Sequence, residues 1–182
     1  MWRNFGIVEV KEDFRGQGVG RKLVEYALNI HGEAGTLSIG IECTPETSIP
    51  FWKHMGFRCS YGNRYYYLLE KQCDIPQPSV PINVEINVYP HDKQWEAETQ
   101  PVQTYHPKAF KCSDEIIYLE ERISIYKNLS IWNKDPLIGI KINGKEVHLS
   151  KAKSQSSNKI GVLCDKGAFS IEKIREKNLV VR

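Results

Sequence analysis

The 182-residue sequence lacks several features that would assign it to a special class of protein. No apolar run approaches the roughly 18 residues of a transmembrane helix, and Met1 to Phe5 form no basic-then-apolar leader. The five cysteines are odd in number and include no C-x-x-C pair, which favours reduced thiols over a disulfide framework. The histidines show no metal-binding spacing, so we expect no metal site. These absences predict a soluble, cytoplasmic protein with no membrane attachment.

The composition is that of an ordinary globular chain, but charge and glycine divide it in two. Hydrophobic residues make up 41% and charged residues 26%, which excludes collagen-like and disordered classes. Residues 1–77 hold 9 basic and 9 acidic residues and 9 of the 13 glycines, whereas residues 78–182 hold 16 and 13 charged residues. Three prolines within residues 76–81 exclude a helix or a central strand there. We therefore expect a first unit over 1–73, a Pro-rich linker or extended edge segment over 74–81, and a second unit over 82–182.

Hydrophobic periodicity in the first unit predicts strands that alternate with two helices. Apolar residues at helical spacing predict a helix from Val19 to Ile30, with a stop at His31-Gly32. A second helix is expected over 45–55, with Thr44 as its cap and Pro45 in its first position. The expected strands of this unit lie at 5–10, 37–41 and 65–69.

The second unit is predicted to be mostly β. Apolar and polar residues alternate strictly from Val80 to Val88, and Asn143-Gly144 is favoured at a two-residue hairpin turn. Residues 114–129 fit either a helix or a strand, and their β-branched side chains favour the strand. Further short strands are expected at 137–142, 147–149, 160–163, 169–171 and 179–181, with a polar loop at 151–159.

The segment that points to chemistry is Arg15-Gly16-Gln17-Gly18-Val19-Gly20-Arg21, between the first strand and the first helix. Glycines let a backbone turn tightly and approach a bulky ligand, because no Cβ stands in the way. Backbone N–H groups and the positive end of the helix dipole then converge, which suits a phosphate or pyrophosphate. An ordinary Gly-rich turn is the alternative. The segment lacks the Gly-Lys-Ser/Thr of a Walker A loop and the acidic residue of a Rossmann fingerprint.

Three segments together resemble the GNAT acetyltransferase superfamily. Arg15-x-x-Gly18-x-Gly20 is similar to the family's Q/R-x-x-G-x-G/A signature, and Ser48 to Phe57 resembles its second signature, A-x-x-F-Y-x-x-x-G-F. Tyr65 to Lys71 resembles the family's final strand. The order and spacing of the three segments make them specific as a set. The resemblance covers roughly residues 4–71 and nothing beyond.

The resemblance implies an α+β fold, in which the C-terminal part of a GNAT-like mixed sheet with two helices is followed by the mostly β unit. It implies an N-acyltransferase that moves an acetyl group from acetyl-CoA, its co-substrate, to an amine acceptor. In the family, the strand before the loop pairs with pantetheine, the loop wraps the pyrophosphate, and the second helix lines the far side. The residues that the resemblance assigns to the cofactor are Val8, Glu9, Val10, Arg15, Gly16, Gln17, Gly18, Val19, Gly20, Arg21, Ser48, Phe51 and Trp52.

The sequence departs from the family pattern at points that concern catalysis. The family's N-terminal half, which supplies much of the acceptor site, is not found ahead of residue 4, and Pro45 replaces a frequent asparagine. Trp52 stands where a tyrosine often serves as general acid, and an indole N–H cannot protonate a departing thiolate as a phenol can. The remaining catalytic candidates are Glu9 as base and Tyr61 as acid. The alternatives are a non-catalytic CoA-binding or protein-interaction module, and a ligand-binding β domain attached to a vestigial acetyltransferase half.

Two further expectations concern partners. Without the preceding strands, the strand at 5–10 has an open edge that invites pairing, so we expect a second subunit in a homo-oligomer, or the β-rich unit, to cover it. Residues 141–182 hold 10 basic and 4 acidic residues, but these charges are dispersed and few aromatics accompany them. We expect a solvated basic face there rather than a nucleic-acid site.

Overall fold

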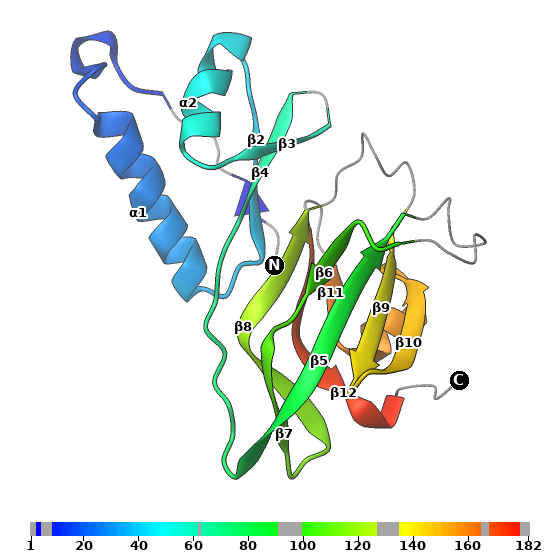
Figure 1. Ribbon diagram of the computed structural model, residues 1–182. Coiled ribbons are helices and arrows are strands. Elements are labelled where there is room, and N and C mark those ends of the chain that lie inside the picture. Colours follow the sequence, from blue (N-terminus) through cyan, green and yellow to red (C-terminus); the bar gives the residue numbers. More distant parts are fainter. Residues whose placement is uncertain are drawn as a thin grey trace. The chain divides into compact units, whose positions relative to one another are not determined.

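The computed structural model describes residues 3–4, 9–61, 63–90, 100–126, 135–164 and 168–178. The chain forms two compact units, a first that ends at Lys71 and a second that begins at Gln72. The fold is mixed α+β and mostly β (Figure 1). Among the described residues, no helix is long and apolar enough to cross a membrane.

The first unit is built on a four-stranded sheet with the strand order β1-β2-β4-β3. Strand β1 pairs in parallel with β2, whereas β4 pairs antiparallel with both β2 and β3. The strands are β1 Arg3–Asn4, β2 Ser38–Glu42, β3 Arg58–Tyr61 and β4 Arg64–Leu68. The helical elements are η1 Glu12–Phe14, α1 Val19–Glu33, η2 Glu46–Ser48 and α2 Ile49–His54. This arrangement contains one parallel crossover, β1–α1–β2.

Helix α1 begins at Val19 as expected, but the expected stop at His31-Gly32 is wrong. Both residues lie inside the helix, which ends at Glu33 with Ala34 as its C-cap. Gly35 then takes the left-handed conformation at φ +70°, and the Thr36 N–H donates to the His31 carbonyl at 3.0 Å. A glycine in this conformation ends a helix at little steric cost, so Gly35 and not Gly32 provides the stop.

Two other expectations in the first unit need correction. The helix expected over 45–55 is divided, because Pro45 is extended at ψ 161°, and α2 begins only at Ile49. Thr44 is therefore not the helix cap, and Pro50 rather than Pro45 occupies the first turn of α2. Of the strand expected at 5–10, Glu9 and Val10 lie outside any strand, and residues 5–8 lie outside the described residues.

The core of the first unit lies between α1, α2 and the sheet. Val24 of α1 and Ile39 of β2 are almost fully buried, and Leu28 packs against the same cluster. Trp52 of α2 is also buried and meets the Phe57 ring edge to face, with 5.1 Å between ring centroids. Each fully buried apolar side chain of this size stabilises the fold by about 1.5–3 kcal/mol. These contacts fix the positions of both helices on the sheet.

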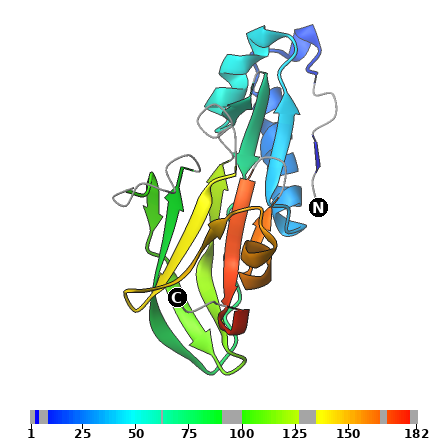
Figure 2. The same ribbon diagram turned by 90° about the vertical axis from the view of Figure 1, so that its right-hand side faces the viewer.

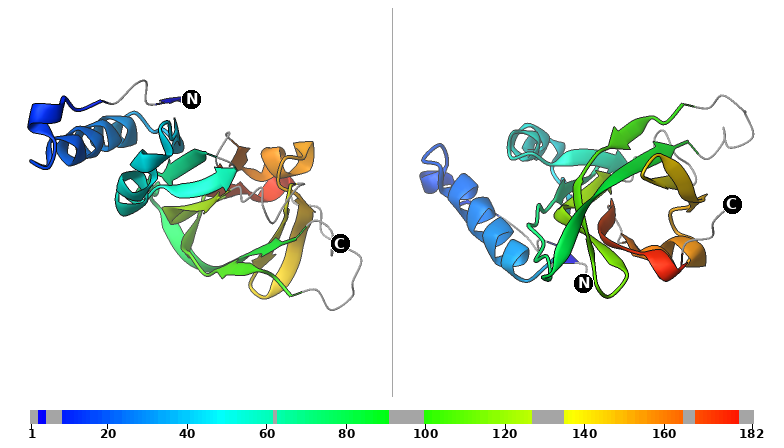
Figure 3. Two further views of the ribbon diagram at one scale, coloured as in Figure 1. Left: turned by 90° about the horizontal axis from the view of Figure 1, so that it is seen from above. Right: turned by 60° about the horizontal axis from the view of Figure 1, so that its bottom comes forward.

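The second unit is a curled antiparallel sheet (Figure 3). Its strand order is β10-β9-β5-β7-β8-β12-β11, and β6 pairs with β5. Helix α3, Gln155–Ile160, lies against both β10 and β11, the strands at the two ends of this order (Figure 2). The strands are β5 Ser79–Tyr89, β6 Gln103–Tyr105, β7 Lys108–Cys112, β8 Ile116–Tyr126, β9 Leu137–Ile142, β10 Lys145–Lys151, β11 Val162–Cys164 and β12 Ala168–Arg175.

Several sequence expectations for the second unit are confirmed. The alternating run at 80–88 is strand β5, and residues 116–126 of the ambiguous segment form strand β8. Asn143 and Gly144, both at positive φ, form the turn between β9 and β10. Residues 79–81, at the end of the expected linker, lie in β5 and pair with β7.

The polar loop expected at 151–159 is wrong, because it contains most of helix α3. Ser154 caps this helix, and its Oγ accepts from the Ser157 N–H at 3.0 Å. Strands β6 and β7 were not anticipated from the sequence. The strand expected at 160–163 is shifted, since Ile160 ends α3 and β11 begins at Val162. The strand expected at 179–181 lies outside the described residues.

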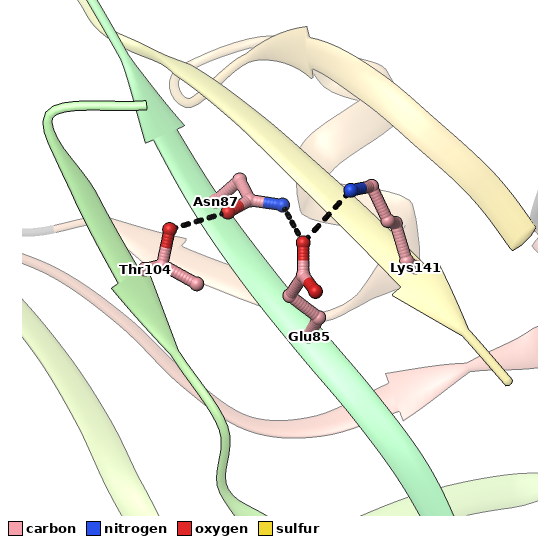
Figure 4. Close-up of polar contacts among 4 residues, drawn as sticks. All are labelled: Glu85, Asn87, Thr104 and Lys141. Carbon is pink, nitrogen blue, oxygen red and sulfur yellow. Dashed lines mark hydrogen bonds and ion pairs between the residues drawn. The ribbon is translucent and has the colours of Figure 1, made fainter. Parts of the chain in front are cut away.

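A polar cluster ties β5 to its neighbours on the face away from the core (Figure 4). The Glu85 carboxylate accepts from the Asn87 amide at 2.6 Å and pairs with the Lys141 ammonium at 2.9 Å. The Asn87 amide oxygen in turn accepts from the Thr104 hydroxyl at 2.7 Å. Because strand side chains alternate, Val84, Ile86 and Val88 fill the core while Glu85 and Asn87 face outward.

We predict that Glu85 makes the free energy of unfolding depend on pH. The hydrogen bond from Asn87, and then that from Lys141, lowers the pKa of Glu85 below its ordinary value of 4.5. Such a carboxylate contributes stability that is complete above the unfolded pKa and is lost as pH falls through the folded pKa. Below about pH 4.5, urea denaturation should therefore show a steeper loss for wild type than for Glu85→Gln.

The matched control is Glu70→Gln, which neutralises an exposed carboxylate in the first unit, outside the Glu85 cluster. It should keep the wild-type slope of unfolding free energy against pH. Parallel slopes for wild type and Glu85→Gln would show that the Glu85 cluster contributes no pH-dependent stability.

Candidate functional site

A cavity of about 1030 Å³ opens in the first unit. It is lined by the loop that leads into α1, by the end of β2, and by the segment that leads into and forms α2. The lining residues are Glu9, Val10, Phe14, Arg15, Gly16, Gly18, Val19, Gly20, Arg21, Ile41, Glu42, Thr44, Pro45, Thr47, Ser48, Phe51 and Trp52. The cavity therefore lies at the carboxyl end of β2, where ligands commonly bind in sheets with parallel strands.

Two glycines shape the loop that leads into the N-terminus of α1. Gly16 and Gly18 have φ values of +74° and +76°, a left-handed conformation that residues with a Cβ rarely adopt. Apart from the adjoining residues, no heavy atom of the described residues lies within 4 Å of a Cβ built on either glycine, so the backbone there is open to approach. Gly18 is the N-cap of α1, and a glycine has no side chain that could accept a hydrogen bond from the N–H groups of the first turn. The backbone of Gly16 and Gly18 is therefore exposed to the cavity, with no side chain covering it.

The first turn of α1 presents partial positive charge to the same cavity. Val19, Gly20 and Arg21 form this turn and line the cavity, and their N–H groups precede the first intrahelical hydrogen bond, from the Lys22 N–H to the Gly18 carbonyl at 3.1 Å. The turn, which is described in full, contains no acidic residue that would compete for these N–H groups. Free N–H groups and the helix dipole together favour an anion.

Two side chains hold the loop in this shape. The Arg15 Nε–H donates to the Val10 carbonyl at 3.0 Å, across the base of the loop. The Gln17 amide donates to the Asp13 carbonyl at 2.8 Å. Arg15 also lines the cavity, so one side chain both stabilises the loop and contributes to the site. Gln17 bonds within the loop and does not line the cavity.

Helix α2 forms the apolar wall opposite the loop. A Cβ built on Gly20 would meet the Phe51 Cζ and the Val10 Cγ2, both at 3.5 Å. These are ordinary van der Waals distances, so position 20 lies directly against Phe51 and Val10. Phe51 is half-exposed and meets the buried Trp52 ring edge to face at 5.2 Å.

The cavity combines cationic and anionic side chains. Arg15 and Arg21 carry positive charge beside the loop, while Glu9 and Glu42 add two carboxylates to the lining. Arg21 is exposed and pairs with Glu25 one turn along α1 at 2.7 Å. The hydrogen bond that the Arg21 guanidinium donates to the Glu25 carboxylate raises the pKa of Arg21.

The structure brings together most of the residues that the sequence assigned to the cofactor. All of them line this cavity except Gln17, which bonds within the loop, and Val8, which lies outside the described residues. Of the two catalytic candidates, Glu9 lines the cavity. Tyr61 belongs to β3, and its side chain is outside what the structure describes.

Sequence reasoning missed several lining residues that lie around the end of β2 and before α2. Ile41 and Glu42 end the strand, and Thr44 and Thr47 precede α2. The signal available in the sequence was their position at the end of the strand expected at 37–41 and before the helix expected over 45–55. Within the described part of the chain, no cluster of three or more His, Cys, Asp or Glu residues is placed to hold a metal ion.

Comparison with known proteins supports the resemblance over part of the chain. The family model of the acetyltransferase (GNAT) domain matches residues 2–59. This segment contains the glycine loop, α1, β2 and α2, so the resemblance to GNAT acetyltransferases over a segment is confirmed. The match indicates an acyltransferase-type activity for this segment. No curated protein and no solved structure matches the chain.

We predict that the same substitution at two glycines of this helix region has opposite effects on stability. Gly18→Ala places a Cβ at φ +76° and should lower the free energy of unfolding by about 1–2 kcal/mol. Gly32→Ala lies inside α1 with open space around the new Cβ, and it should raise the free energy of unfolding by about 0.5–1 kcal/mol. Urea denaturation measures both. Shifts of the same sign would contradict the left-handed geometry at Gly18.

Proposed function

We propose that the first unit binds acetyl-CoA in this cavity and transfers its acetyl group to an amine acceptor, as a cytoplasmic N-acyltransferase of GNAT type. One observation carries the proposal: a glycine loop with open backbone leads into the N-terminus of α1 at the wall of a large cavity, within the segment that matches the family. The acyltransferase class rests on the match, and the substrates are our proposal.

The loop suits the pyrophosphate of CoA. Gly16 and Gly18 leave open the space that a Cβ would otherwise take, so phosphate oxygens can reach the backbone N–H groups. The free N–H groups of the first turn of α1 supply further donors. Arg15 and Arg21 add positive charge beside this turn. A dianionic pyrophosphate would therefore find both directional hydrogen bonds and a favourable field.

The apolar wall suits the acyl-pantetheine arm. Val10, on the loop side, and Phe51 and Trp52, on α2, line the cavity beyond the glycines. In the family the backbone of the strand before the loop, here Val8 to Val10, pairs with the amides of pantetheine. We assign the same role to that backbone. We also propose that Ser48, at the end of η2, contacts the opposite side of the pantetheine arm.

The transfer would form a C–N bond and break the thioester C–S bond. A neutral amine attacks the acetyl carbonyl, backbone N–H groups polarise that carbonyl, and CoA leaves as the thiolate, which takes up a proton. We assign the base to Glu9, which lines the cavity, acting directly or through a water molecule. Trp52 cannot supply the proton to the thiolate, and Tyr61 is the proposed donor.

The second candidate function is a non-catalytic CoA-binding or interaction module. The observation that favours it is the burial of Trp52 against Phe57 in the place of the family's tyrosine, which removes a phenol from the site. Under this reading the β-rich unit performs the main function. In either case we propose a homo-oligomer.

We predict that the protein binds acetyl-CoA with micromolar affinity in isothermal titration calorimetry. Gly18→Glu places a carboxylate and a longer side chain in the open space of the loop, and it should weaken binding at least about tenfold through like-charge repulsion. Gly18→Ala is the matched control, since it carries the same left-handed strain without the charge. Equal affinities for the Glu and Ala variants would place the pyrophosphate elsewhere.

We predict that Glu9→Gln lowers the turnover of acetyl-CoA with an amine acceptor by about 10²-fold or more and leaves the acetyl-CoA dissociation constant within about twofold. Release of free CoA thiol, followed over a panel of small and peptidyl primary amines, measures turnover. Glu46→Gln, near α2 and outside the cavity lining, is the control. Tight binding without turnover on any amine would favour the non-catalytic module.

A further inference from the structure

Phe14 is an exposed aromatic residue that lines the cavity. It ends the short 3₁₀ helix η1, directly before the glycine loop (Figure 1). Its side chain is 52% exposed, and it lines the cavity together with Gly16 and Gly18. Phe14 belongs to neither hydrophobic core cluster of the described residues. Its ring therefore contributes little to the packing of its own unit.

The place of Phe14 in the cavity sets it apart from the single exposed apolar residues that are common on protein surfaces. The aromatic residues of the described lining are Phe14, Phe51 and Trp52. Phe51 and Trp52 belong to α2, whose apolar wall we assign to the acyl-pantetheine arm. Phe14 comes from the loop side and is the most exposed of the three. It is an aromatic surface beside the anion site that the proposed function leaves unused.

Hydrogen bonds hold the backbone around Phe14. Its N–H donates to the Lys11 carbonyl at 2.9 Å, within η1. The carbonyl of the preceding residue, Asp13, accepts from the Gln17 side-chain amide at 2.8 Å. With the backbone fixed and only two side-chain torsions, the Phe14 ring has little freedom to lose when a ligand binds against it.

An adenine nucleotide matches what this neighbourhood offers. In CoA a single ribose separates the pyrophosphate from the adenine, so a pyrophosphate at the glycine loop keeps the adenine close to the loop. The Cα atoms of Phe14 and Gly16 are at most about 7 Å apart, because only two peptide units join them. Residues 11–15 hold two basic and two acidic side chains, so the segment presents a ring rather than a net charge. Adenine has an uncharged, planar face of the kind that stacks on aromatic side chains.

We propose that Phe14 stacks on the adenine ring of the cofactor and makes the site selective for an acyl donor that carries a nucleotide. The inference rests on the proposed function, because it takes acetyl-CoA as the ligand. The α2 wall then contacts the acyl arm, the glycine loop binds the pyrophosphate, and Phe14 binds the base. An acyl group carried on 4′-phosphopantetheine alone lacks the last of these contacts.

Isothermal titration calorimetry with two probes tests this contact. The probes are acetyl-CoA and acetyl-4′-phosphopantetheine, which keeps the acyl arm and one phosphate but lacks the adenosine. Phe14→Ala should raise the Kd for acetyl-CoA about tenfold, a typical loss when an aromatic partner of a stacked base is truncated. The same variant should leave the Kd for acetyl-4′-phosphopantetheine within about twofold of wild type.

Matched variants separate the aromatic face from mere apolar bulk. Phe14→Tyr keeps a ring and should bind acetyl-CoA within about twofold of wild type, whereas Phe14→Leu should bind as weakly as Phe14→Ala. Leu23→Ala is the control, since Leu23 is 49% exposed on α1 and is not among the lining residues. Because these side chains are exposed, the circular dichroism and urea unfolding of all four variants should match wild type.

The ¹H NMR spectrum of the bound ligand gives a readout that a merely structural role would not move. Stacking places adenine H2 and H8 in the shielding region of the Phe14 ring, so both signals should shift upfield with wild type and Phe14→Tyr. The upfield shift should be lost with Phe14→Leu.

The outcomes keep this inference apart from the proposed function. An unchanged Kd for acetyl-CoA in Phe14→Ala, equal losses for both probes, or a Phe14→Leu variant that binds like wild type would each overturn the stacking contact alone. A wild type that binds neither probe would overturn the proposed function, and the stacking contact with it.

Discussion

The candidate site depends on the hydrogen bond between the Arg15 guanidinium and the Val10 carbonyl, which closes the base of the glycine loop. The loop can follow this path only because Gly16 and Gly18 adopt positive φ, a conformation that costs other residues about 1–2 kcal/mol. Together these constraints aim the first turn of α1 at the cavity. Gly20 lies against Phe51, which forms the opposite wall. One short segment thus creates the anion site and one side of its apolar wall.

The cavity combines the two signs of charge that the proposed acyl-CoA-dependent transfer would use. Free N–H groups and arginines gather at the loop, and Glu9 and Glu42 provide carboxylates elsewhere in the lining. A phosphate-bearing cofactor and a cationic amine need opposite fields, and one cavity here holds groups of both signs. The β-rich unit has its own core and its own polar cluster at Glu85. Its presence extends the chain well beyond the segment that matches the family.

The parts of the fold that could be predicted from the sequence are those specified by local chemistry. Glycine spacing located the loop and the start of α1, and Asn143-Gly144 located a hairpin. Helix α3 was missed because residues 151–159 show no apolar periodicity, and the helix depends on its serine cap and on packing against two strand edges. The end of α1 was missed because Gly32 is tolerated inside the helix. Glu42 and Thr44 were missed because they join the site only through the order of the strands, which no local pattern encodes.

The most direct test of the account is a ¹H–¹⁵N NMR titration of the full chain with acetyl-CoA. The account predicts that the largest amide shifts fall on Gly16 to Arg21, with a second set on Phe51 and Trp52. Amides of the strands β5 to β12 should change little. Shifts concentrated in the β-rich unit, or a spectrum unchanged at millimolar acetyl-CoA, would contradict the assignment of the glycine loop as the cofactor site.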